Sequence, residues 1–96
     1  MDEFPQFPNN IYCLPSQQVL IDRTRHTCQY VSALLQEEEI DGVRLKALGD
    51  QLEAAVDEMD LFSRTNVPQE WVMATVEHIQ QLLNRVRQVQ NALLEE

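Results

Sequence analysis

Residues 68–95 read PQEWVMATVEHIQQLLNRVRQVQNALLE and form the longest helical pattern in the chain. A proline in the first turn suits a helix start, because its missing N–H would have no partner there, and Glu70 complements the helix dipole. No glycine or proline interrupts the rest of the stretch. Two adjoining apolar seams run along it, made of Val72, Thr75, Val76, Ile79, Leu82, Leu83, Val86, Val89 and Leu93. A face this broad predicts a helix of about 40 Å that packs against two other helices at once.

Two further helical segments precede this stretch, at about residues 16–39 and 43–63. Ser16 directly follows a proline and is a favourable capping residue for the first segment. The second segment carries a heptad pattern formed by Leu45, Leu48, Leu52, Ala55, Met59 and Phe62. Gly49 interrupts this helix at a cost of roughly 1 kcal/mol, and its missing side chain would permit close helix contact. Short connections favour antiparallel neighbours, so the sequence predicts an all-α, up-down-up three-helix bundle over residues 16–96.

A rival organisation is one unbroken helix from residue 16 to residue 63. The apolar seam of the first segment continues in register through Glu38 and Asp41 into the second. An unbroken helix would therefore place two carboxylates in an apolar seam, which is unfavourable unless they are paired. A turn around Asp41 and Gly42 instead brings the acidic residues close to the positive start of the next helix. The sequence therefore favours a hairpin over the long helix.

Residues 1–15 lack helical periodicity and contain three of the four prolines. Proline forbids a stable helix there and biases the preceding residues toward extended conformations. The segment is nevertheless rich in aromatic residues, including Phe4 and Phe7, unlike a typical disordered tail. Two interpretations follow: an extended arm laid along a groove of the bundle, or a docking peptide for another protein.

The composition excludes several classes of partner. Sixteen acidic and seven basic residues among 96 give a formal charge of −9, which repels nucleic-acid phosphates and anionic lipid headgroups. We therefore expect neither nucleic acid nor membrane as a direct partner. No apolar run is long enough to span a bilayer, and the acidic N-terminal residues do not resemble a signal peptide. The sequence predicts a single intracellular domain.

The residues that could carry chemistry do not form a recognisable site. Cys13 and Cys28 are too few for a disulfide framework, so we expect reduced thiols. His26 and Cys28 are two residues apart on a helix and point in different directions, which disfavours a metal site. With two glycines in the chain there is no phosphate-binding loop, and no serine lies in a nucleophile motif. We expect a protein without catalytic, cofactor-binding or metal-binding residues, and therefore not an enzyme.

Two functions remain compatible with the sequence. The first is a non-catalytic protein–protein interaction or oligomerisation module, a helical scaffold that binds another protein or a second copy of itself. Its candidate interface is the end of the third helix, at Val86, Val89 and Leu93, where a homodimer would cover exposed aliphatic residues. The alternative is an acidic adaptor that recruits a basic protein through its charged surface or through Phe4 and Phe7 of the arm.

Overall fold

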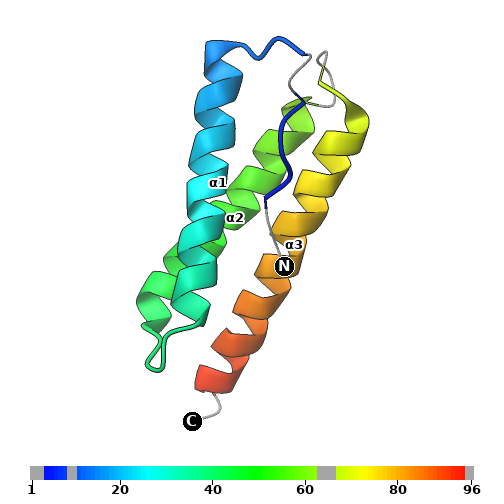
Figure 1. The fold of residues 1–96 in the computed structure, drawn as a ribbon. Coiled ribbons are helices and arrows are strands. Elements are labelled where there is room, and N and C mark those ends of the chain that lie inside the picture. The colour runs from blue at the N-terminus through cyan, green and yellow to red at the C-terminus, as the bar shows by residue number, and fades with distance from the viewer. Residues whose placement is uncertain (1–3, 9–10, 63–66, 95–96) are drawn as a thin grey trace.

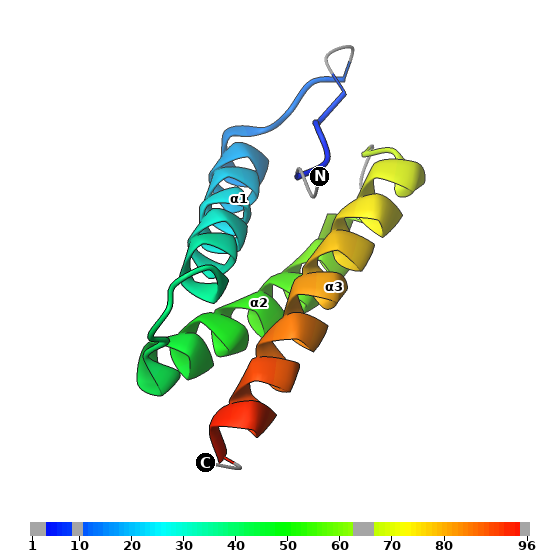
Figure 2. The same cartoon turned by 60° about the horizontal axis from the view of Figure 1, so that its bottom comes forward.

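The computed structural model describes residues 4–8, 11–62 and 67–94, apart from the side chain of Leu61. These residues form helices α1 (Pro15–Leu35), α2 (Gly42–Phe62) and α3 (Gln69–Leu94), and no strand occurs in these ranges. The helices pack lengthwise into a body with extents of 48 × 21 × 20 Å (Figures 1 and 2). The predicted all-helical fold with three helices is therefore confirmed.

Helix α1 differs from the predicted range 16–39 at both ends. It begins at Pro15, whose fixed φ suits the first helical position, so Ser16 lies inside the helix instead of capping it. The backbone N–H of Leu14 donates to Gln17 Oε1 at 3.0 Å and so is satisfied at the helix start. The helix ends at Leu35, earlier than predicted, because the glutamates of residues 37–39 would oppose the negative end of the helix dipole.

The chain turns between α1 and α2 through residues 36–41, at the bottom of Figure 1. Asp41 Oδ1 accepts hydrogen bonds from the backbone N–H groups of Val43 at 3.0 Å and Arg44 at 3.4 Å. This carboxylate caps α2 and explains why the helix begins where it does. Gly42 is consequently the first helical residue and not a turn residue. The break between α1 and α2 excludes the single long helix.

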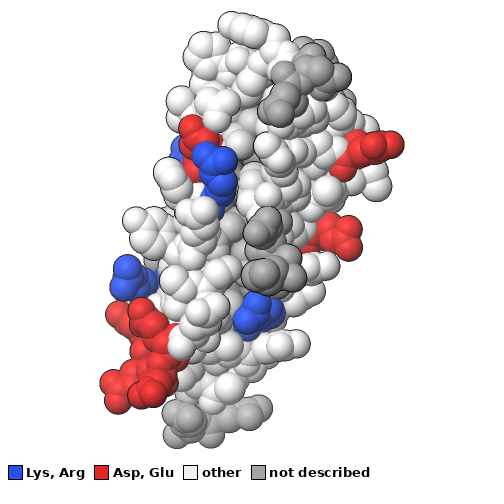
Figure 3. Space-filling model, viewed as in Figure 1, with Lys and Arg blue, Asp and Glu red and all other residues white. Residues whose placement is uncertain are grey.

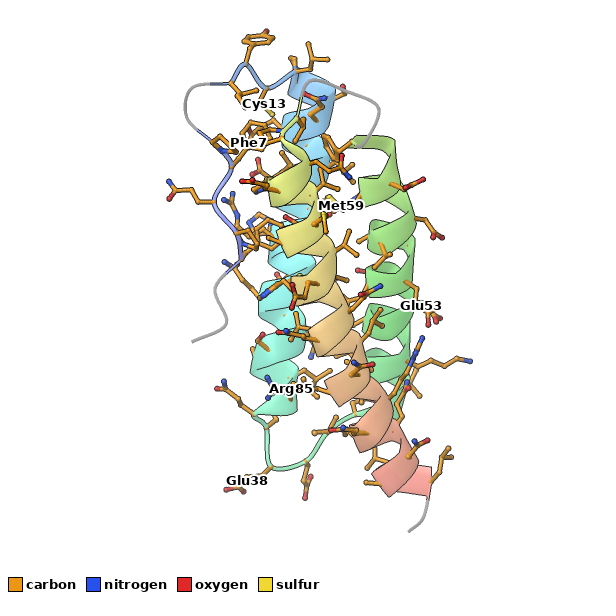
Figure 4. The ribbon with its side chains drawn as sticks, turned by 90° about the vertical axis from the view of Figure 1, so that its right-hand side faces the viewer. Phe7, Cys13, Glu38, Glu53, Met59 and Arg85 are labelled. Carbon is orange, nitrogen blue, oxygen red and sulfur yellow. The ribbon has the colours of Figure 1, made fainter. Side chains whose placement is uncertain are left out.

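The core lies along the line where the three helices meet. Five of the described apolar side chains have no exposed area, namely Val31, Leu45, Leu52, Met59 and Ile79. Ile79 belongs to both predicted seams of α3, and Met59 lies among the helices in Figure 4. The buried hydroxyl of Thr75 donates to the carbonyl of Trp71 at 2.8 Å, which allows a polar residue in the seam. Among the described residues, every buried side-chain nitrogen and oxygen has a hydrogen-bond partner.

Gly49 allows a close approach of α2 and α3. A Cβ atom at this position would lie 3.3 Å from Cγ1 of Val86, closer than ordinary van der Waals contact. The cost of glycine within a helix is thus offset by the packing of α3 against it. The close helix contact that a missing side chain permits is present at Gly49.

Candidate protein-interaction surfaces

A groove runs along the outer side of the α2–α3 pair. It consists of two adjoining hollows of about 700 Å³ and about 590 Å³, which share Val56, Asp57 and Gln80. The described side chains that line it belong to α2 and α3, and on α3 they extend from Gln69 to Arg87. We call this surface the α2–α3 groove.

The floor of the larger hollow of the α2–α3 groove is apolar. Val56 of α2 and Val76 of α3 are half-buried there, and Met73 is 64% exposed. Val72, Val76 and Leu83 belong to the second seam of α3, which the sequence assigned to contact with another helix. Val72 and Leu83 are themselves buried, so the apolar surface that faces solvent in the groove comes from Val56, Val76 and Met73.

The rim of the groove is acidic. Asp57 and Asp60 lie on its α2 side and Glu77 lies on its α3 side. At the far end, Arg87 Nη2 donates to Glu53 Oε1 at 2.9 Å, and Glu53 points outward from α2 in Figure 4. Among the described residues that line the groove, four carboxylates and one guanidinium give a formal net charge of −3.

The candidate interface at the end of α3 is only partly exposed. Val86 is 1% exposed and packs in the core, so the expectation that it lies uncovered is wrong. Val89 is half-buried, whereas Leu93 is 37% exposed. A Cβ at Gly42 would lie 3.7 Å from Cδ1 of Leu93, so the last turn of α3 lies beside the start of α2. The end of α3 therefore does not outrun its neighbour, which is why Val86 is covered.

Two further apolar residues are exposed at this end of the bundle. Leu94 follows Leu93 and is 84% exposed, and Val43 in the first turn of α2 is 83% exposed. We call Val43, Leu93 and Leu94 the end patch. The acidic residues of the α1–α2 loop lie at the same end, at the lower left of Figure 3.

Phe4 and Phe7 contact their own chain. The ring of Phe7 meets Trp71 edge-on with centroids 5.1 Å apart, and the ring of Phe4 meets His78 in the same way at 5.8 Å. Trp71 Nε1 also donates to the carbonyl oxygen of Pro5 at 3.2 Å. Residues 4–8 therefore lie against the first half of α3, between α1 and α3 in Figures 1 and 2.

Trp71 was not singled out by the sequence pattern, although it holds these contacts together. Its ring also packs edge-on against Phe62 at 5.9 Å, so it links residues 4–8, the end of α2 and the start of α3. The residue type alone could have indicated this role, because the indole N–H of a buried tryptophan needs a hydrogen-bond acceptor.

Neither thiol is set up for nucleophilic chemistry. Burial raises the pKa of Cys28 to about 11, and burial together with the charge of Asp22 raises the pKa of Cys13. Both thiols are therefore protonated at neutral pH, whereas the reactive form of cysteine is the thiolate.

Within the described ranges, no three His, Cys, Asp or Glu side chains are grouped so that they could hold a metal ion. No described helix combines the length and the apolar character that crossing a membrane requires.

Comparison of the chain with protein families, curated proteins and solved structures finds no significant match. The α2–α3 groove and the end patch are the two surfaces from which a function can be inferred.

Proposed function

We propose that this protein is a non-catalytic protein–protein interaction or oligomerisation module that acts inside the cell, where its thiols stay reduced. The proposal takes the helices in antiparallel up-down-up order, with residues 1–15 as an extended arm. Arg23, early in α1, pairs with Glu58, late in α2, at 2.6 Å. Gly42 at the start of α2 lies beside Leu93 at the end of α3. Both contacts support this order.

The end patch carries the proposal. Leu94 and Val43 are each more than four-fifths exposed at one end of a small acidic body. Aliphatic residues grouped on a surface are unfavourably hydrated, and a two-fold homodimer buries the same patch from both copies. We propose that two copies associate through Val43, Leu93 and Leu94.

Charge sets the conditions under which such a dimer forms. Glu37, Glu38, Glu39 and Asp41 lie in the loop at the same end of the molecule. Two copies that meet there bring these like charges together, and added salt screens their repulsion. We therefore expect self-association to strengthen as the salt concentration rises.

Sedimentation velocity at tens of micromolar tests the proposal. We expect the wild type to dimerise and Leu94→Glu to remain monomeric, because the substitution places a charge in the contact. Val19→Glu is the matched control, since Val19 is 65% exposed on α1, away from the end patch. This variant should dimerise like the wild type. A wild type that stays monomeric at high salt removes the proposal, and a dimer that survives Leu94→Glu places the contact elsewhere.

The second candidate function is an acidic adaptor that recruits a basic protein. The formal charge of −9 over the chain and the acidic rim of the groove favour it. Recruitment through the arm would require Phe4 and Phe7 to leave His78 and Trp71, which costs their present contacts. The charged surface is therefore the better candidate. Such binding weakens as salt rises, the opposite of the dependence expected for the dimer.

A further inference from the structure

We infer that the α2–α3 groove is a docking site for a basic amphipathic helix of another protein. The inference rests on the second candidate function and adds to it the place of binding and the kind of partner. It depends on three properties of the groove: its apolar floor, its acidic rim on both sides and its length.

The apolar floor fits a helix. Met73 and Val76 lie about one helical turn apart on α3, and Val56 faces them from α2. A helix laid between two packed helices presents its own apolar stripe to such a floor, as the fourth helix of a bundle does. The lining extends from Gln69 to Arg87, which corresponds to about 27 Å of helix. An occupant of about five turns would cover it.

The rim selects a basic occupant. Asp57 lies on the α2 side and Glu77 on the α3 side, so an occupant meets carboxylates along both of its flanks. Lysine or arginine residues on either side of an apolar stripe would complement them. The Arg87–Glu53 pair makes the far end less acidic, so the basic residues belong at the end near Asp57 and Glu77.

Two other occupants are disfavoured by the structure. Residues 4–8 of this chain contact Trp71 and His78 and do not line the groove. A second copy would bring another molecule of charge −9 against an acidic rim, which repels it. A basic helix from a different protein meets neither obstacle.

A synthetic peptide of eighteen residues tests the inference on the full chain. Its sequence places leucines at heptad spacing and lysines on both flanks, and a fluorophore reports binding by anisotropy. A scrambled peptide with the same composition and charge lacks the apolar stripe. A third peptide keeps the stripe and carries glutamate in place of lysine. We expect saturable binding of the first peptide and at least tenfold weaker binding of the other two.

Two pairs of variants locate the site. Met73→Glu should weaken binding of the first peptide at least tenfold, whereas Val19→Glu, at a side chain of nearly equal exposure on α1, should change it less than twofold. Asp57→Lys should weaken binding more than Glu38→Lys, which changes the net charge equally but lies in the α1–α2 loop. Added salt should reduce the difference between Asp57→Lys and Glu38→Lys.

Each contrary outcome has a distinct meaning. If the scrambled peptide binds as tightly as the first peptide, or if Asp57→Lys and Glu38→Lys weaken binding equally, the groove is not the docking site. The adaptor function would still stand. No binding of any basic peptide at low salt overturns both. Self-association that Met73→Glu abolishes shows that a second copy occupies the groove, and this also overturns the inference.

Discussion

Trp71 connects parts of the chain that are far apart in sequence. Its ring packs against Phe7 and Phe62, and its indole N–H donates to the carbonyl of Pro5. Aromatic pairs of this geometry contribute about 0.5–1.5 kcal/mol beyond the area that they bury. These contacts offset the entropy lost when residues 4–8 are ordered against α3.

Replacing Phe7 by Ala should expose Trp71. Trp71 is 6% exposed and is the single tryptophan of the chain, so its fluorescence reports this site alone. We expect a red shift of the emission, because water reaches the indole once the Phe7 ring is removed. Tyr12→Ala is the control, since Tyr12 is 72% exposed. Identical spectra for wild type and Phe7→Ala would contradict the packing of residues 4–8 on α3.

Cys28 should make stability depend on pH in the alkaline range. Burial raises its pKa to about 11 from an ordinary 9.0, so the folded protein keeps the proton while the unfolded chain loses it. The stabilisation is complete below about pH 9 and is lost as the pH rises toward 11, where the loss amounts to about 2 kcal/mol. Urea unfolding of wild type and Cys28→Ala between pH 8 and pH 11 measures it. The wild type should lose more free energy of unfolding than the variant, and equal slopes would exclude this role.

At the scale of the elements, the apolar spacing predicted the number of helices because each helix must bury one stripe. The helix ends were less predictable, since they depend on which of several caps is used. Pro15 occupies the first helical position in place of a Ser16 cap, and Asp41 starts α2. The prediction of an uncovered Val86 came from the lengths of the two helical patterns, about 28 residues for 68–95 and about 21 for 43–63, which do not reveal how the helices align.

The α2–α3 groove could not be predicted from the spacing. The two seams of α3 indicate a broad apolar face, but they do not say which part another helix covers. That depends on the rotation of α3 about its own axis relative to α2, and the approach of Val86 to Gly49 is one contact that defines it. Val76 and Met73 are left facing the groove as a result.

Gly49→Val tests this close approach. Valine is a better helix former than glycine, so helix propensity alone predicts a small stabilisation. The added atoms would overlap Val86, however, because a Cβ at position 49 already lies 3.3 Å from its Cγ1. We expect a loss of about 1–3 kcal/mol from overpacking. In the control Ala54→Val, at an exposed position of α2, the loss should be about 0.5 kcal/mol. A more stable Gly49→Val protein would show that the α2–α3 contact is loose.

At the scale of the whole molecule, the two candidate functions use different surfaces and respond oppositely to salt. The end patch joins apolar residues beside an acidic loop, so screening favours its burial. The groove attracts opposite charge, so screening weakens its complex. Because the surfaces do not share residues, one copy could use both. A dimer would then present two grooves and gain avidity for a partner with two basic helices.

The shape of the proposed dimer follows from where the end patch lies. The longest extent of one copy is 48 Å, and the patch is at one end of that axis. Two copies that meet there form an elongated particle whose length approaches roughly twice that of one copy. Small-angle X-ray scattering over a concentration series should show the maximum dimension rising with concentration, and more steeply at high salt. Leu94→Glu should keep the length of a monomer throughout. A dimer no longer than one copy would mean that the molecules associate side by side, and the end patch would then not be the contact.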